Sequence, residues 1–277
     1  MTPYYSDAFV TLFLGNCRDV LADSFSENSF DHAITDAPYD PKTHAGARSN
    51  KTGPGVKTIQ FEPIDPKVVE LTLSYYAKRW CLTFCSMEML GDYARAVGPE
   101  RWIRSAIWVR PDGTPQITGD RPAQGAEGIA IWKASTERSR WNAHGKRGIY
   151  RSVYECNVVK GSGRVHETQK PESLMAELIE DFTDRGESIL DSFAGSGTTG
   201  VAAKKLGRRA TLIEIDEKRC EDAAKRLSQA VLWEVPTAPD SEIPPDLFAQ
   251  LDTDDGDAGG EGTEAATTRD RARRDSA

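Results

Sequence analysis

The stretch SILDSFAGSGTTGVAAKKLGRRATLIEID, residues 188–216, decides the fold class of this 277-residue chain. An apolar strand at Ser188–Leu190 runs into a glycine-rich turn, and a helix over Thr198–Leu206 leads to a second strand at Arg209–Ile215. Asp216 then caps another helix. A strand, a helix and a strand in this order predict two parallel neighbours in one sheet.

The same alternation extends upstream of this stretch. We expect strands at Phe9–Leu14, His32–Thr35, Trp80–Phe84 and Ala106–Val109, and helices at Asp65–Arg79, Met87–Val97, Pro171–Phe182 and Asp216–Leu232. This pattern predicts an α/β fold with a doubly wound, mostly parallel sheet. Residues 111–165 show no clean period, so we expect an inserted irregular region of short strands and loops there.

The charge of the chain is concentrated in its tail. The formal net charge is −8, but the residues from Glu234 onward include 12 acidic and 4 basic side chains, so the preceding part is neutral. That tail is poor in large apolar residues. We therefore expect a folded domain over 1–235 and a disordered acidic tail over 236–277.

Composition argues against several classes of protein. No apolar run approaches the roughly 20 residues of a membrane span, and the first residues lack a signal-peptide pattern, so we expect a cytoplasmic protein. Five scattered cysteines argue against a disulfide framework. We expect no metal site, because no His, Cys, Asp or Glu cluster has the spacing of metal ligands.

The glycine-rich turn at 191–200 predicts a ligand site. Gly195 and Gly197 let the backbone approach a ligand, and the following helix presents free N–H groups suited to a carboxylate or phosphate. Glu214 ends the next strand, where it can accept hydrogen bonds from ribose hydroxyls.

Two nucleotide-binding classes compete for this turn. Gly195, Gly197 and Gly200 fit G-x-G-x-x-G, so a nicotinamide-dinucleotide oxidoreductase is an alternative. Two observations argue against the oxidoreductase. Asp191 would repel a pyrophosphate but could bind an ammonium group. In addition, fewer βα units follow the turn than a dinucleotide-binding domain normally has. A P-loop NTPase is excluded because no Gly-Lys-Ser/Thr follows the glycines.

A second motif, Asp36-Ala37-Pro38-Tyr39, follows the predicted strand His32–Thr35. The amino group of a nucleobase is a poor nucleophile because its lone pair is delocalised into the ring. The Asp36 carboxylate and the Ala37 carbonyl can each accept one N–H, which leaves the nitrogen more tetrahedral. Pro38 fixes the turn, and Tyr39 offers a ring for stacking.

Together these motifs resemble the N6-adenine/N4-cytosine DNA methyltransferases in their permuted (beta-class) order, over roughly residues 9–230. Asp36–Tyr39 matches the catalytic tetrapeptide, which usually has proline where this chain has Ala37. Asp191–Gly200 matches the cofactor loop, and 166–171 (HETQKP) the segment before it. Gly15-Asn16-Cys17 matches the segment near the cofactor's adenine.

The resemblance implies S-adenosylmethionine as the cofactor and adenine N6 as the favoured target. It assigns the catalytic site to Asp36, Ala37, Pro38 and Tyr39. It assigns cofactor binding to Asn16, His166, Thr168, Lys170, Asp191, Phe193, Ala194, Gly195, Ser196, Gly197, Thr198 and Glu214. The alternatives are cytosine-N4 methylation, the oxidoreductase discussed above and a non-catalytic DNA protein that binds the cofactor.

The resemblance also implies that double-stranded DNA is the partner and that the target base leaves the duplex; a homodimer stays open. We place a target-recognition region at about 110–165. Arg104–Lys170 contain 12 Lys or Arg against 6 Asp or Glu, which suits a phosphate backbone. The candidate contacts are Arg104, Arg110, Arg121, Lys133, Arg138, Arg140, Lys146, Arg147, Arg151, Lys160 and Arg164, with Trp108, Trp132, Trp141, Tyr150 and Tyr154.

Overall fold

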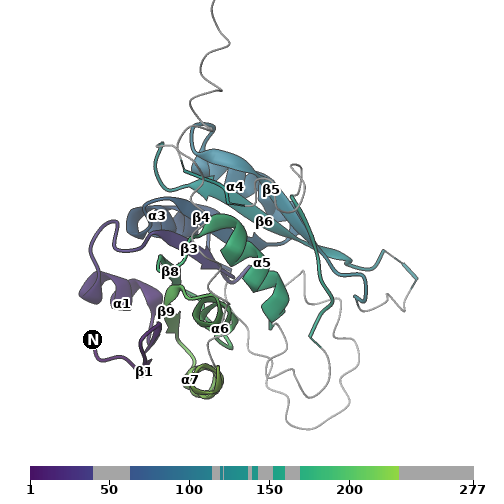
Figure 1. The fold of residues 1–277 in the computed structure, drawn as a ribbon. Coiled ribbons are helices and arrows are strands. Elements are labelled where there is room, and N and C mark those ends of the chain that lie inside the picture. The colour runs from purple at the N-terminus through teal and green to yellow at the C-terminus, as the bar shows by residue number, and fades with distance from the viewer. Residues whose placement is uncertain are drawn as a thin grey trace, which may run out of the picture. The chain divides into compact units, whose positions relative to one another are not determined.

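The computed structural model describes residues 1–39, 63–113, 119–120, 122–136, 139–142, 152–159 and 169–230. Within these residues the chain forms one nine-stranded sheet with helices on both faces (Figure 1). The acidic tail expected over 236–277 lies outside the described residues, so the domain boundary near 235 stays a prediction.

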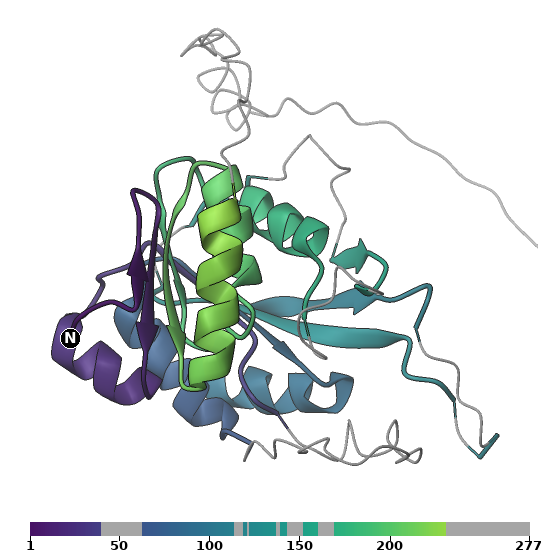
Figure 2. The same cartoon turned by 90° about the horizontal axis from the view of Figure 1, so that it is seen from below.

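The sheet has the strand order β1-β2-β9-β8-β3-β4-β6-β5-β7. The strands are β1 Tyr5–Ser6, β2 Val10–Leu14, β3 His32–Thr35, β4 Trp80–Cys85, β5 Trp102–Val109, β6 Ala126–Lys133, β7 Val153–Glu155, β8 Ser188–Asp191 and β9 Arg209–Glu214. Figure 2 shows the purple amino-terminal strands beside the green strands of the last third. Only β1 and β6 run antiparallel to their neighbours in the described sheet, so it is mostly parallel, as predicted.

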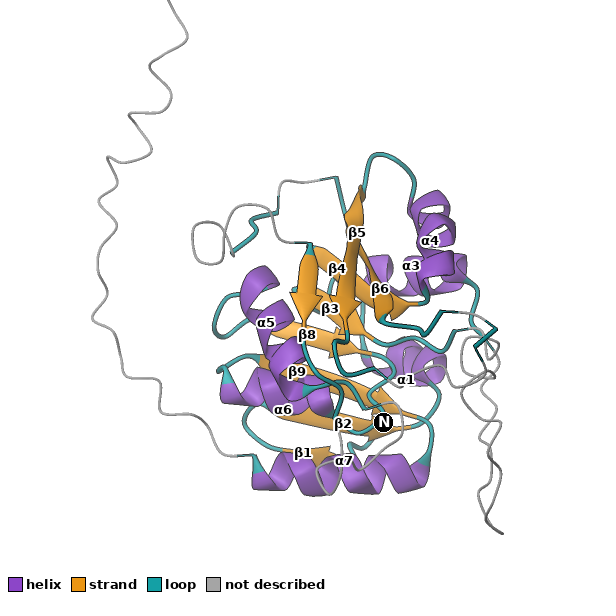
Figure 3. Cartoon of the chain, turned by 90° about the vertical axis from the view of Figure 1, so that its right-hand side faces the viewer, coloured by secondary structure: helices purple, strands orange, loops and turns teal. Residues whose placement is uncertain are grey.

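The helices divide between the two faces of the sheet (Figure 3). One face carries α1 Cys17–Ser24, α3 Pro66–Tyr76, the 3₁₀ turn η1 Met87–Met89 and α4 Leu90–Val97; the other carries α5 Glu172–Phe182, α6 Thr198–Lys205 and α7 Glu217–Gln229. Asn16, Asp65 and Asp216 each cap a helix by accepting a backbone N–H in its first turn. None of the described helices is both long and apolar enough to cross a bilayer.

Two hydrophobic cores lie on the two faces. Alternate residues of one strand belong to different cores: Leu12 packs on the side of α5–α7, whereas Phe13 packs on the side of α1 and α3. Ile34 and Ala33 of β3 divide in the same way. Successive side chains of a strand point to opposite faces, so a sheet covered on both sides needs apolar residues throughout.

Sequence reasoning expected short strands and loops at 111–165 but gave no strand there a position. Ala126–Lys133 form β6, an eight-residue strand between β4 and β5. Most of its side chains are buried, so it lacks the polar–apolar alternation that marks a half-exposed strand.

The helix α3 also ends earlier than expected, at Tyr76 rather than Arg79. The next residues pair with the chain before β3: Lys78 and Arg79 donate backbone N–H groups to the carbonyls of Phe30 and Asp31, at 2.9 and 3.0 Å. These contacts are made by extended backbone, so they compete with the last turn of the helix.

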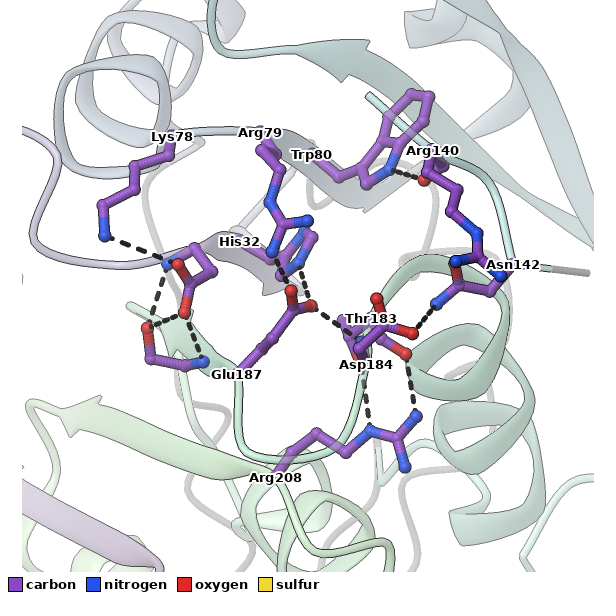
Figure 4. Close-up of polar contacts among 12 residues, drawn as sticks. His32, Lys78, Arg79, Trp80, Arg140, Asn142, Thr183, Asp184, Glu187 and Arg208 are labelled. Carbon is purple, nitrogen blue, oxygen red and sulfur yellow. Dashed lines mark hydrogen bonds and ion pairs between the residues drawn. The ribbon is translucent and has the colours of Figure 1, made fainter. Parts of the chain in front are cut away.

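Charged side chains tie the amino ends of the central strands together (Figure 4). Glu187 lies 2.8 Å from His32 Nε2 and also pairs with Arg79. Asp31 accepts the backbone N–H of Ser188 at 2.9 Å. This edge of β3, β4 and β8 is therefore closed by its own side chains.

The carboxyl ends of β3 and β8 form a topological switch point. The two strands are neighbours, but β3 connects through α3 to β4 on one side, and β8 connects through α6 to β9 on the other. In open α/β sheets such a reversal leaves a crevice where ligands bind. The segment 36–39 follows β3 and the glycine loop follows β8, so both motifs meet at this crevice.

Candidate active site

The Asp-Ala-Pro-Tyr turn begins directly after β3. Ala37 is buried, whereas Asp36, Pro38 and Tyr39 are half-buried. The Pro38 carbonyl accepts the backbone N–H of Ile64 at 3.1 Å, which pins the turn to the chain that enters α3.

Lys170 lies beside the Asp36 carboxylate. Its Nζ is 2.7 Å from Asp36 Oδ2 and 3.0 Å from Glu127 Oε2, and it lies 4.8 Å from the centre of the Phe84 ring. Burial lowers the pKa of Lys170, but the carboxylates of Asp36 and Glu127 outweigh it and raise that pKa above its ordinary value. Lys170 therefore remains a cation. Sequence reasoning placed Lys170 in the cofactor site; in the structure it contacts the Asp36–Tyr39 turn, and its role towards the cofactor stays a prediction.

The Glu127 carboxylate also binds Tyr39. Its hydroxyl donates to Glu127 Oε2 at 3.3 Å. Burial first, and then the nearby carboxylates, raise the pKa of Tyr39. The phenol therefore stays protonated and acts as a hydrogen-bond donor. Arg110 Nη1 donates to the other oxygen of Glu127, Oε1, at 2.9 Å.

The glycine loop turns through left-handed backbone at two positions, Gly195 (φ +52°) and Gly197 (φ +74°). Glu214 binds this loop: its Oε2 accepts the backbone N–H of Gly195 at 2.7 Å, and its Oε1 accepts that of Asp216 at 3.0 Å. Ala194 is pinned by a 2.9 Å bond from its N–H to the Ile213 carbonyl. A carboxylate offers about four lone-pair sites, so Glu214 keeps capacity for hydroxyl donors.

The Asp191 side chain accepts three hydrogen bonds from neighbouring segments. Its carboxylate accepts from Thr35 Oγ1 at 2.7 Å, from Thr199 Oγ1 at 2.6 Å and from the Phe193 N–H at 3.1 Å. Burial raises its pKa, and these donors oppose the rise. Asp191 thus ties β3 to the first turn of α6, a role that sequence reasoning did not foresee.

Ser196 and Thr198 are buried and face α7. Arg226 Nη1 lies 2.5 Å from the Ser196 carbonyl, 3.0 Å from Ser196 Oγ and 3.1 Å from Thr198 Oγ1. The bonds to Arg226 fix the shape of the loop from behind. This places the two hydroxyls, expected at the cofactor, in contact with a helix.

Asn16 lies at the carboxyl end of β2, next to Glu214, because the Gly15 N–H donates to the Glu214 carbonyl at 2.9 Å. The Asn16 side chain accepts the N–H of Arg18 and so caps α1. Nearby, a mostly apolar hollow connects α1, α3 and the loop. It is lined by Cys17, Arg18, Ile64, Val68, Val69, Thr72, Leu73, Ser192 and Phe193.

The structure corrects several residues expected at the DNA. Trp108, Trp132 and Tyr154 are buried in the two cores, and Arg110 pairs with Glu127. Of the other candidates, Arg104 and Arg140 are exposed. The remaining described ones are Lys133 and Trp141; Arg121, Arg138, Lys146, Arg147, Tyr150, Arg151, Lys160 and Arg164 lie outside the described residues, as do His166 and Thr168.

Three residues of the site were missed by sequence reasoning: Thr35, Glu127 and Arg226. The one signal in the sequence is Glu127 itself, because a carboxylate that enters an apolar run such as GIAIW must find a partner if it is buried. The described residues contain no group of three or more His, Cys, Asp or Glu that could hold a metal ion.

Comparisons with known proteins identify the family of the chain. A family model described as DNA methylase (N6/N4 methyltransferase) matches residues 84–225. The chain is 31% identical over 144 residues to the type II methyltransferase M.HinfI of Haemophilus influenzae, covering 46% of this chain and 40% of that protein. It is 50% identical over 70 residues to M2.DpnII of Streptococcus pneumoniae, covering 25% of this chain and 26% of that protein. The chain therefore spans less than half the length of these relatives.

Solved structures show the same fold. The M1.HpyAVI–SAM complex superposes with a TM-score of 0.61 at 20% identity, covering 79% of this chain and 98% of that one. The cytosine-N4-specific PvuII DNA methyltransferase superposes with a TM-score of 0.62 at 14% identity, covering 90% of this chain and 93% of that one. The family model spans slightly more than half of the sequence and includes Glu127, Lys170, the glycine loop and Glu214. The chain belongs to the N6/N4 DNA methylase family.

Proposed function

We propose that this protein transfers the methyl group of S-adenosylmethionine to the exocyclic amino group of a base in double-stranded DNA, with adenine N6 as the favoured target. One observation carries the proposal: the Asp36 turn and the glycine loop leave neighbouring strands at the same switch point. A base-orienting group and a nucleotide-binding loop thus face one crevice.

The turn supplies the acceptors that an amino group needs. Asp36 Oδ2 accepts one bond from Lys170, and a carboxylate retains further lone-pair sites for a base N–H. The Ala37 carbonyl is the second acceptor. Holding both N–H groups directs the nitrogen lone pair towards the methyl donor, and the ring of Tyr39 supports the base by stacking.

The residues of the loop fit the proposed cofactor. Gly195 and Gly197 let backbone approach a ligand, Glu214 offers carboxylate oxygens beside Asn16, and Phe193 lines a mostly apolar hollow next to the loop. When bound there, S-adenosylmethionine supplies an electrophilic methyl group on a sulfonium. The transfer converts it to S-adenosylhomocysteine, and the amino nitrogen that gains the methyl group releases one proton to solvent.

Of the three alternatives, two differ from the proposal in testable ways and one is set aside. Cytosine N4 is the other amino group of this type; the resemblance favours adenine because N4-specific members often have serine where this chain has Asp36. Hydride transfer with a nicotinamide cofactor is set aside, since the chain belongs to the DNA methylases. A cofactor-binding protein without activity differs from the proposal only in turnover.

The experiment uses methyl-labelled S-adenosylmethionine and unmethylated genomic DNA. We expect label in the DNA and, after digestion to nucleosides, N6-methyladenine; N4-methylcytosine would identify the cytosine alternative. A protein that binds the cofactor but never labels DNA would contradict the proposal.

A matched pair of variants tests the role of Asp36. Asp36→Ala should abolish transfer while calorimetry finds cofactor affinity within about threefold of wild type, because the carboxylate acts on the base. Asp23→Ala, in the exposed part of α1, should leave both unchanged. Full activity in Asp36→Ala would remove this residue from the mechanism.

A further inference from the structure

Glu127 lies at the centre of a buried charge cluster although it belongs to none of the sequence motifs. It stands on β6, 5% exposed, within hydrogen-bond distance of Tyr39 in the Asp36–Tyr39 turn. Its Oε1 pairs with Arg110, and its Oε2 lies 3.0 Å from Lys170 Nζ and accepts from the Tyr39 hydroxyl. The Glu127 carboxylate thus contacts both Lys170, which binds Asp36, and Tyr39.

Burying these charged groups costs free energy unless each is paired with a group of opposite charge. An unpaired carboxylate inside a protein loses its hydration, so Glu127 depends on Arg110 and Lys170. Lys170 in turn lies between two carboxylates, with the rings of Phe84 and Trp108 at 4.8 and 5.9 Å. A cation enclosed by rings and two anions has few positions open to it.

We propose that Glu127 is a positioning residue for the methyl transfer, holding Lys170 against Asp36 and the ring of Tyr39 beside it. The inference rests on the proposed function. Lys170 has three N–H donors, and the cluster directs one to each carboxylate. Glu127 thereby sets where the Asp36 oxygens lie, without itself touching the base.

The position of the Asp36 oxygens explains why a carboxylate that does not touch the base matters for the reaction. Asp36 must place an acceptor within hydrogen-bond reach of an amino group while the ring stacks on Tyr39. A misplacement of about 1 Å in such a site costs on the order of 100-fold in rate. Without the charge of Glu127, Lys170 is drawn towards Asp36 alone, and the Tyr39 hydroxyl loses a charged acceptor.

If Glu127 only stabilised the fold, its loss would affect kcat no more than the loss of another buried, paired carboxylate. Glu70 provides the comparison, because it is also buried and is bound by two cations, Lys67 at 2.7 Å and Arg101 at 2.5 Å. It is a buried residue of α3, and its side-chain bonds run to Lys67, Ser74 and Arg101 instead of to residues 36–39. Glu127→Gln and Glu70→Gln remove the same charge from similar environments.

The kinetic test measures both variants with labelled cofactor and unmethylated genomic DNA. Glu127→Gln should lower kcat by about 10- to 100-fold while the KM and Kd of the cofactor stay within about threefold of wild type. Glu70→Gln should retain wild-type kcat. Equal kcat values for Glu127→Gln and wild type would overturn the inference.

A double-mutant cycle separates action through Lys170 from an independent effect. If Glu127 acts through Lys170, the Glu127→Gln/Lys170→Gln double variant should lose no more kcat than Lys170→Gln alone. Losses that multiply would contradict this route.

Crystal structures of wild type and the Glu127→Gln variant test the inference without an activity measurement. In the Glu127→Gln variant we expect the Lys170 and Tyr39 side chains to move; unchanged positions of Lys170, Tyr39 and Asp36 would overturn it. If wild type transfers no methyl group, the proposed function fails while this structural test still stands.

Discussion

Thr35 Oγ1 donates a 2.7 Å hydrogen bond to Asp191 Oδ1, and both groups are buried. Thr35 is the last residue of β3, directly before Asp36, and Asp191 is the last residue of β8, directly before the glycine-loop residues. This bond joins the two halves of the site at the point where their strands end. The same carboxylate holds Thr199, so the link reaches the first turn of α6.

Removing that hydroxyl should weaken the fold and the cofactor site together. Thr35→Val keeps the shape of the side chain but leaves a buried carboxylate with one donor fewer, which costs about 1–3 kcal/mol of unfolding free energy. Urea denaturation measures the loss, and calorimetry should show weaker cofactor binding. Thr11→Val makes the same change on β2, where Thr11 is only half-buried, and should cost less than about 0.5 kcal/mol. Equal losses in the two variants would show that the Thr35 bond is unimportant.

Gly200 should not tolerate even a methyl group. It lies in α6, and an added Cβ would lie 2.6 Å from Leu212 Cδ1 and 2.9 Å from Leu227 Cδ2. Overpacking of this kind costs about 1–3 kcal/mol, so Gly200→Ala should lower the melting temperature. Gly91→Ala is the control: Gly91 is an exposed residue of α4 with its nearest contact at 3.5 Å, and helix propensity predicts a gain of about 1 kcal/mol. A stable Gly200→Ala variant would mean that α6 can move off the sheet.

Acid should destabilise the protein through His32. This side chain is fully buried, and burial together with Arg79 lowers its pKa from 6.5 to about 3, against the opposing charges of Asp31 and Asp184. Between these two pKa values the unfolded chain binds a proton that the folded chain excludes. Stability is therefore complete above pH 6.5 and falls as the pH is lowered, by at most about 1.4 kcal/mol per pH unit.

The matching measurement compares wild type with His32→Gln. Between pH 7 and pH 5.5, wild type should lose about 1 kcal/mol more unfolding free energy than the variant, since glutamine cannot take up the proton. Other titrating groups are shared and cancel in the difference. Parallel pH profiles would show that the pKa of His32 is the same in the folded and unfolded chains, and a smaller loss in wild type than in the variant would show that Glu187 keeps His32 protonated in the fold.

Arg226 should control cofactor affinity from outside the crevice. Arg226→Gln removes the guanidinium that holds Ser196 and Thr198, so the glycine loop loses its support and we expect about tenfold weaker binding of the cofactor. Lys225→Gln changes the adjacent residue, whose exposed ion pair with Glu221 contributes little, and should bind normally. If calorimetry finds equal affinities, the loop keeps its shape without Arg226.

The sequence by itself determined the fold class, the order of the two motifs and the turns that carry them. Those features are local: apolar runs mark strands buried on both faces, Asp65 and Asp216 cap helices, and the glycines of 195–197 are required by left-handed backbone.

Only the tertiary structure decided which side chains meet. Lys170 reaches Asp36 across 134 positions and Thr35 reaches Asp191 across 156, and no local pattern encodes such pairs. The strand β6 was not located from the sequence because Glu127 and Gly128, two residue types that strands disfavour, precede its apolar run, and only its neighbours β4 and β5 give Glu127 its place in the site.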